Sequence, residues 1–175
     1  PSPVPEWNFL VTEPGVAIEY VWTGEGDGKR FEDPLNWGRD ASANPVFIQS
    51  PFIIDAPNTE ISAPRLDALG DGKLVLRSGV VTGLNHGFSG GQLSIERGRM
   101  ERRFLVNSRA SVSMGGILIL AGADEPLNRS TVDLEYGGTL VFLGESPADV
   151  RSEHLSKITL SGAPAATSDN LVIQE

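Results

Sequence analysis

Apolar and polar residues alternate in short segments along the middle of this chain. The pattern Gly, any residue, Leu, any residue, large apolar residue occurs four times, and the segments begin 19, 25 and 22 residues apart. They cover residues 72–76, 91–95, 116–120 and 138–142. Because side chains two positions apart lie on the same face of a β-strand, each segment predicts a strand with one apolar face.

The recurrence of roughly 20 residues predicts a β-solenoid, in which each coil stacks on the one before it. Further alternating triplets, at 112–114, 132–134 and 158–160, fit additional strands of the same stack. Glycine before a strand suits a corner, because glycine accepts a positive φ and the close approach of another backbone. We therefore expect an all-β, parallel β-helix or solenoid-like fold in which the leucines of successive segments stack along one axis. The alternative is a β-sandwich or jelly roll, whose strands also alternate.

A solenoid exposes unpaired backbone and an apolar cross-section at each end, and these must be capped or paired. Residues 1–60 are expected to form an N-terminal cap with a turn-rich lid, and residues 61–162 the solenoid body. Residues 163–175 are expected to form a linker and a terminal strand. The apolar residues of that strand, which can pair with its own body or with a neighbouring subunit, are Leu171, Val172 and Ile173.

The turn-rich segment at residues 22–37 combines aromatic residues, glycines and acidic side chains. Its aromatic residues can cover an apolar end as a lid while the glycines let the backbone turn tightly; they are Trp22, Phe31 and Trp37. Three of its polar residues, Asp27, Asp33 and Asn36, supply oxygen atoms that suit Ca²⁺. The spacing is not that of an EF-hand, and the competing interpretation is that these side chains hold turns without any cofactor.

The same segment reads W-x-G-x-G-D-G-x-x-F-x-D-x-x-N-W. It resembles the segment that opens β-helical modules in large secreted bacterial proteins, including autotransporter passenger-like ones. The later Gly-x-Leu-x-apolar segments are similar to the coils of such modules, so the resemblance extends over residues 20–143. It implies a right-handed parallel β-helix with a role in adhesion, display or assembly at the cell surface or outside the cell, and it implies no particular enzyme.

Charge and composition narrow the possible functions. Acidic residues outnumber basic ones 23 to 14, a net charge of -9, so we do not expect nucleic acid as a partner. Cysteine is absent and histidine occurs twice, which excludes disulfide scaffolds and thiolate zinc sites. No apolar run approaches the 18 or so residues that a membrane-spanning helix needs, so membrane insertion is not expected. The chain starts at Pro1 without a basic, apolar leader, so we expect a processed product or an excised piece of a longer chain; a secreted or cell-surface protein whose signal peptide has been removed fits this start.

Catalysis is not expected from this sequence. It contains neither a recognisable Ser-His-Asp arrangement nor a phosphate-binding or dinucleotide-binding motif. The alternative is a polysaccharide-binding or polysaccharide-degrading β-helix. Its acidic groups would come from Asp55, Glu60, Asp67, Asp71, Glu96, Glu101, Asp133 and Glu135, which the sequence does not bring together as a catalytic pair. The aromatic residues that could stack on sugar rings are Trp7, Tyr20, Trp22, Trp37 and Tyr136.

Positive charge is concentrated in one part of this acidic chain. Five arginines fall within 13 positions, and they are Arg97, Arg99, Arg102, Arg103 and Arg109. Such a cluster could dock on an acidic surface of an identical subunit, although pairing with Glu96 and Glu101 would explain it as well. The sequence therefore predicts a non-catalytic structural or adhesive module that self-associates into an extracellular assembly or filament, with a polysaccharide as the alternative partner.

Overall fold

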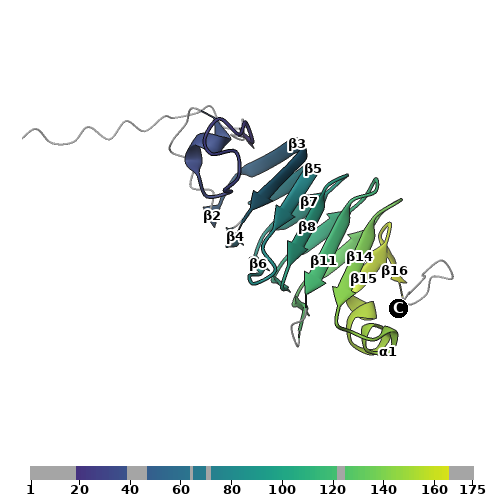
Figure 1. Cartoon of the computed structure of the whole chain (residues 1–175). Coiled ribbons are helices and arrows are strands. Elements are labelled where there is room, and N and C mark those ends of the chain that lie inside the picture. Colours follow the sequence, from purple (N-terminus) through teal and green to yellow (C-terminus); the bar gives the residue numbers. More distant parts are fainter. Residues whose placement is uncertain (1–18, 39–46, 64, 70–71, 122–124, 166–175) are drawn as a thin grey trace, which may run out of the picture.

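The protein is an all-β solenoid of about five coils, whose strands stack in parallel along one axis (Figure 1). The computed structural model describes residues 19–38, 47–63, 65–69, 72–121 and 125–165. Within these ranges the predicted β-helical fold is confirmed, and the strands do not form the two facing sheets of a sandwich. Trp7, Asp71, Leu171, Val172 and Ile173, which the sequence singles out, lie outside the described residues.

Each complete coil crosses three ladders of strands, which we call faces A, B and C in chain order. Face A consists of β2 (Phe47–Ile48), β4 (Leu66–Ala68), β6 (Phe88–Ser89), β9 (Leu105–Val106) and β12 (Leu127–Asn128). Face B consists of β1 (Tyr20–Val21), the first halves of β3 (Pro51–Ser62) and β5 (Lys73–Thr82), then β7 (Gln92–Ile95), β10 (Arg109–Val112), β13 (Thr131–Leu134) and β15 (Ile158–Leu160). Face C consists of the second halves of β3 and β5, then β8 (Arg99–Arg102), β11 (Ile117–Ala121) and β14 (Thr139–Leu143). The parallel pairing therefore already begins at β1 and β3, on the N-terminal side of residue 61.

The leucines of the glycine-led segments form two columns rather than the single column that the repeat predicts. Leu74 pairs with Leu93 on face B, whereas Leu118 pairs with Leu140 on face C. On face B the partner of Leu93 in the next coil is Ala110. The interval of 25 residues in the repeat thus marks a move from one face to the next, because glycine precedes a strand at corners of both faces.

The triplet at residues 112–114 is also shifted from its predicted place. The strand β10 ends at Val112, and its inward residues are Ala110 and Val112, which pair with Val132 and Leu134. Met114 has a φ of 53° and is 67% exposed, so it belongs to the turn that follows the strand. Alternation alone could not distinguish these two registers, because both place an apolar residue at every second position.

The paired glycines have two separate structural roles at the corner between faces B and C. Gly115 and Gly137 have φ values of 87° and 78°, in the left-handed region that favours glycine. Gly116 and Gly138 have ordinary φ values, but a side chain there would meet the preceding coil. A Cβ atom would lie 2.5 Å from Ile95 O at Gly116 and 2.0 Å from Val112 O at Gly138. Both reasons for glycine that the sequence suggests are therefore present, at adjacent positions.

Both apolar ends of the stack are covered by the chain itself, at the C-terminal end by short helical turns that the sequence did not predict. At the N-terminal end, a short 3₁₀ helix, η1 (Pro34–Trp37), places Trp37 over the first coil, against Phe52. At the other end lie α1 (Pro147–Asp149), the π-helical turn η2 (Val150–His154) and η3 (Leu155–Lys157) (Figure 1). Val150 and His154 are buried there, and the His154 ring stacks on Phe142 at 4.9 Å. The last strand, β16 (Ala163–Pro164), pairs antiparallel with β15.

Candidate functional site

The predicted lid residues form an aromatic cluster that closes the N-terminal end. Trp22, Phe31 and Trp37 are all buried, and the Trp37 ring centroid lies 4.8 Å from that of Phe31 and 4.7 Å from that of Phe52. The indole Nε1 of Trp37 donates a 2.7 Å hydrogen bond to Phe31 O. Because their faces are covered, Trp22 and Trp37 cannot stack on sugar rings, which corrects that part of the polysaccharide hypothesis.

The polar residues of the lid hold its backbone. Asp27 Oδ1 accepts hydrogen bonds from the backbone N–H groups of Lys29 and Arg30 and from the Asn36 side chain. Asn36 Oδ1 accepts from Gly26 N and Gly28 N. The Asp27 carboxylate accepts hydrogen bonds from the backbone N–H and guanidinium of Arg30, from the backbone N–H of Lys29 and from the side-chain amide of Asn36. These hydrogen bonds hold the pKa of Asp27 well below its usual range.

Asp33 belongs to the same network. Its carboxylate accepts from Asp27 N and from Leu35 N, which makes it the N-cap of η1. The side-chain oxygen atoms of the candidate Ca²⁺ ligands therefore accept hydrogen bonds from N–H groups of the lid. This supports the interpretation that these side chains hold turns. Among the residues that the structure describes, no three His, Asp or Glu side chains are grouped so that they could hold a metal ion.

The arginines between 97 and 109 do not form one patch. Arg97 and Arg103 are exposed, and Arg99 points outward from β8 and forms an ion pair with Glu101. Arg109 is on a different face, on the outside of β10. Arg102 departs most from the prediction of a docking surface, since it points into the core and is fully buried. It occupies an inward position of β8, next to Met100 in the alternation of that strand.

The guanidinium of Arg102 has few partners inside the core. Its Nη1 donates to Ala63 O at 2.7 Å, while Nε and Nη2 have no hydrogen-bond partner. Burial lowers the pKa of Arg102 to about 10. A Cβ atom on Gly83 would lie 2.0 Å from Nη1, so the missing side chain at Gly83 makes the space that this guanidinium fills.

The acidic residues that the sequence offers for catalysis are dispersed over the solenoid. Asp67 pairs with Arg65 on face A, and Glu101 with Arg99 on face C. Asp55 accepts a hydrogen bond from Ser78 Oγ at 2.6 Å, where β3 bends between faces B and C. These three carboxylates therefore lie at different places around the coil and do not form a pair.

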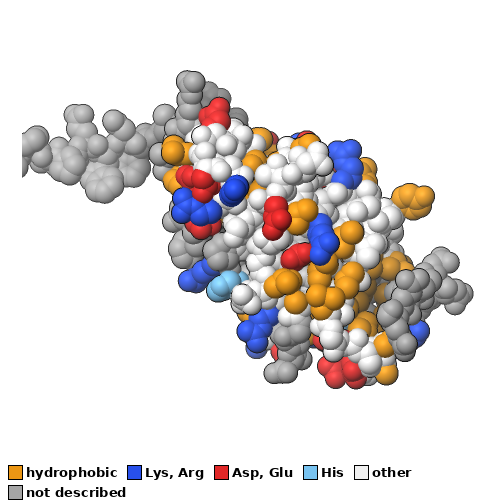
Figure 2. Space-filling view, in the orientation of Figure 1, with side chains coloured by type: hydrophobic (Ala, Val, Ile, Leu, Met, Phe, Trp, Pro, Cys, Tyr) orange, Lys and Arg blue, Asp and Glu red, His pale blue; other side chains and the backbone are white. Residues whose placement is uncertain are grey.

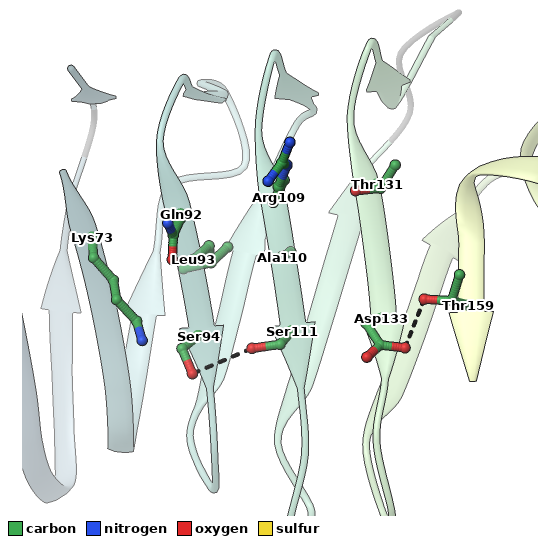
Figure 3. A pocket seen from close by; sticks show the side chains of 10 residues that line it. All are labelled: Lys73, Gln92, Leu93, Ser94, Arg109, Ala110, Ser111, Thr131, Asp133 and Thr159. Atoms are coloured by element: carbon green, nitrogen blue, oxygen red, sulfur yellow. Dashed lines mark hydrogen bonds between the residues drawn. The ribbon is translucent and has the colours of Figure 1, made fainter. Parts of the chain in front are cut away.

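A polar groove of about 400 Å³ runs across the outside of face B. Figure 3 shows the side chains that line it, which come from five successive strands of this face. Two rows of outward residues form most of its lining, and Leu93 and Ala110 line it as well. One row is Lys73, Gln92, Arg109 and Thr131, and the other is Ser94, Ser111, Asp133 and Thr159.

The second notable surface is the free edge of β14. This strand ends the order of strands in its sheet and pairs with β11 alone. Its inward residues Leu140 and Phe142 are only partly buried, whereas Leu118 and Leu120, at the same positions of β11, are fully buried. Among the described residues, no strand covers this edge.

The outward residues beside this edge are apolar, and they form what we call the face C patch: Ile117, Ile119, Ala121, Val141 and Leu143. Ile119, at the centre of the patch, is already buried among its neighbours. Leu143 is 44% exposed. Figure 2 shows hydrophobic side chains gathered over this part of β11 and β14, beside paired acidic and basic groups. The ion pair of Arg99 and Glu101 borders the patch, since these residues pair with Ile117 and Ile119.

No protein-family model, curated protein or solved structure matches this chain. No helix in the described part of the chain is long and apolar enough to cross a membrane. The sequence interpretation did not identify the groove or the edge of β14. The alternating outward residues of face B were a usable signal for the groove, but the edge depends on which strand is last in the stack.

Proposed function

We propose that this protein is a non-catalytic structural module, secreted or displayed at a cell surface, that self-associates by strand addition at the edge of β14. Within the described residues, the last strand of face B and the last strand of face C differ in whether another strand covers their outer edge, and this difference is the observation that carries the proposal. On face B the last parallel strand, β15, is covered by β16, whereas on face C the last strand, β14, has no partner beyond β11. A free edge offers a row of N–H and C=O groups to an extended chain.

The side chains around the edge favour the same interaction. An added strand would lie beside the partly buried Leu140 on the inner side of the sheet, next to Phe142, which stacks on His154. On the other side of the sheet it would extend the face C patch. Burial of this apolar surface would stabilise the contact together with the backbone hydrogen bonds. Both ends of the apolar core already have covers, so strand addition at β14 explains self-association better than contact between open cross-sections.

The strand that we expect to add there is the segment 171–173 of a second copy. Its residues Leu171, Val172 and Ile173 are apolar and mostly β-branched, a composition that favours an extended strand. The segment follows β16 along the chain. A tail that reached the β14 edge of its own chain would instead give a closed monomer, and the experiment below separates these two arrangements.

Sedimentation velocity over a range of protein concentrations tests the proposal. The intact chain is expected to form dimers or larger species as the concentration rises, and a chain that ends at Ala165 is expected to stay monomeric. Truncation after Ala165 retains β16 and the buried side chain of Ala165. An intact chain that is monomeric at every concentration, or unchanged association after truncation, would refute the proposal.

A matched pair of substitutions locates the contact. Val141→Lys places a charge at the free edge, which blocks strand addition, whereas Val80→Lys places one on β5, where both neighbouring strands are present. Both valines are partly buried and point outward on face C. We expect Val141→Lys to abolish association and Val80→Lys to leave it unchanged. Equal effects of the two substitutions would place the contact elsewhere.

A further inference from the structure

The groove on face B contains two cations that have no partner among the described residues. Lys73 and Arg109 are in register with Gln92 between them, so they are two strand spacings apart, roughly 10 Å. Neither residue has an ion pair or a side-chain hydrogen bond within the described part of the chain. In a chain with a net charge of -9, two such cations in one groove indicate a place for negative charge.

The neutral polar residues of the lining can form hydrogen bonds with uncharged polar groups of a ligand. Ser94, Ser111 and Thr131 have hydroxyl groups, and Gln92 has an amide, so they can both donate and accept. The small side chains of Ser94 and Ser111 leave space between the larger residues, and their hydroxyl groups lie 3.4 Å apart (Figure 3). The groove is therefore suited to a ligand that has hydroxyl groups as well as anionic groups.

The one acidic residue of the lining is turned toward the C-terminal end of the groove. Asp133 Oδ1 accepts hydrogen bonds from Thr159 Oγ1 at 2.6 Å and from Gly162 N at 2.9 Å. These contacts attach the β15–β16 hairpin to β13. An anionic ligand would therefore lie over Lys73, Gln92 and Arg109, with Asp133 at its border.

Taken together, the geometry points to a binding site for an extended acidic polysaccharide, with its sugar carboxylates on Lys73 and Arg109. Such a chain has a carboxylate on each acidic ring and hydroxyl groups between them, which matches the alternation of cations and neutral polar groups. Nucleic acid fits less well, because the groove has two cations and no aromatic residue on which bases could stack. An extended peptide would use a free sheet edge, whereas β7, β10 and β13 have neighbours on both sides.

Titration with polygalacturonate, followed by isothermal calorimetry at about physiological salt, tests this site. The intact protein is expected to bind polygalacturonate and not dextran, a neutral polysaccharide. The double substitution Lys73→Gln with Arg109→Gln removes two charge-assisted contacts, and we expect it to weaken binding by about tenfold or more. Both side chains point outward, so the variant should unfold at the same temperature as the intact protein.

The matched control is Arg97→Gln with Arg151→Gln, which changes the net charge equally at two exposed positions outside the groove. It is expected to bind polygalacturonate as the intact protein does. Absence of binding by the intact protein, or equal weakening in the control, would overturn the assignment. Equally tight binding of single-stranded DNA, with the same sensitivity to the two groove substitutions, would also overturn it, because the site would then be one for polyanions in general.

Discussion

The adjacent glycines 115 and 116 allow a direct test of how the coils are packed. Gly115→Ala adds a methyl group where no atom lies within 4 Å, but at a φ of 87°. The cost is the backbone strain of a left-handed alanine, about 1 kcal/mol. Gly116→Ala has no such strain, but its Cβ would lie 2.5 Å from Ile95 O and 3.0 Å from Ile95 C. Because ordinary contacts of a Cβ are 3.4–4 Å, the two coils must separate locally by about 1 Å.

The separation would weaken nearby hydrogen bonds between coils. Two such bonds join the coils concerned, since Ser113 N donates to Ile95 O and Ile117 N donates to Gly98 O, each at 2.9 Å. Overpacking costs about 1–3 kcal/mol, and each weakened hydrogen bond adds up to about 1 kcal/mol, so we expect Gly116→Ala to destabilise the fold by about 3 kcal/mol. Thermal unfolding followed by circular dichroism should show melting temperatures lowered by about 6–12 °C for Gly116→Ala and about 2–4 °C for Gly115→Ala. Equal shifts, or a larger shift for Gly115→Ala, would refute the assignment of close packing to Gly116.

Three further predictions concern the core cation and the lid. Arg102→Met removes a guanidinium whose burial lowers its pKa to about 10, a cost near 3 kcal/mol, and it loses the two hydrogen bonds of Nη1 to Ala63 O and Thr82 O. The urea midpoint should therefore rise by the equivalent of about 1–2 kcal/mol, and a fall would contradict this. Trp37→Ala should destabilise the fold by about 3–5 kcal/mol in the same assay, whereas the control Leu35→Ala, at a side chain 57% exposed, should change it by less than about 0.5 kcal/mol. Because the pKa of Asp27 is lowered in the folded state, its ionised carboxylate stabilises the fold at pH values above the ordinary pKa of 3.8. This stabilisation is lost as the pH falls below 3.8 and through the lower pKa of the folded state. Asp27→Asn should therefore melt below the intact protein at pH 7, with a gap that narrows as the pH falls below about 4; a constant gap would show that the charge of Asp27 does not matter.

The alternation of apolar and polar residues and its recurrence at roughly 20 residues were sufficient to predict the parallel stack and several strands of faces B and C. They did not predict β8, whose inward positions are Met100 and Arg102, or the short strands of face A. Each strand is specified locally, because residues at every second position share a face, as in the inward Leu93 and Ile95 of β7. The glycines before the strands marked corners for an equally local reason, since positive φ is a property of one residue. The aromatic residues of the lid were also recognisable, because large apolar side chains in a turn-rich segment need a surface to cover.

The position of each strand within the stack was decided by tertiary contacts. The assignment of leucines to two faces depends on the length of each connection, and Ala110 in place of a leucine breaks the pattern without breaking the coil. The burial of Arg102 depends on the space left at Gly83, a residue 19 positions earlier that belongs to the preceding coil. The groove and the free edge of β14 likewise arise from side chains and backbone in different coils. Local sterics therefore determined which segments are strands, and the stacking of distant segments determined which surfaces are available for binding.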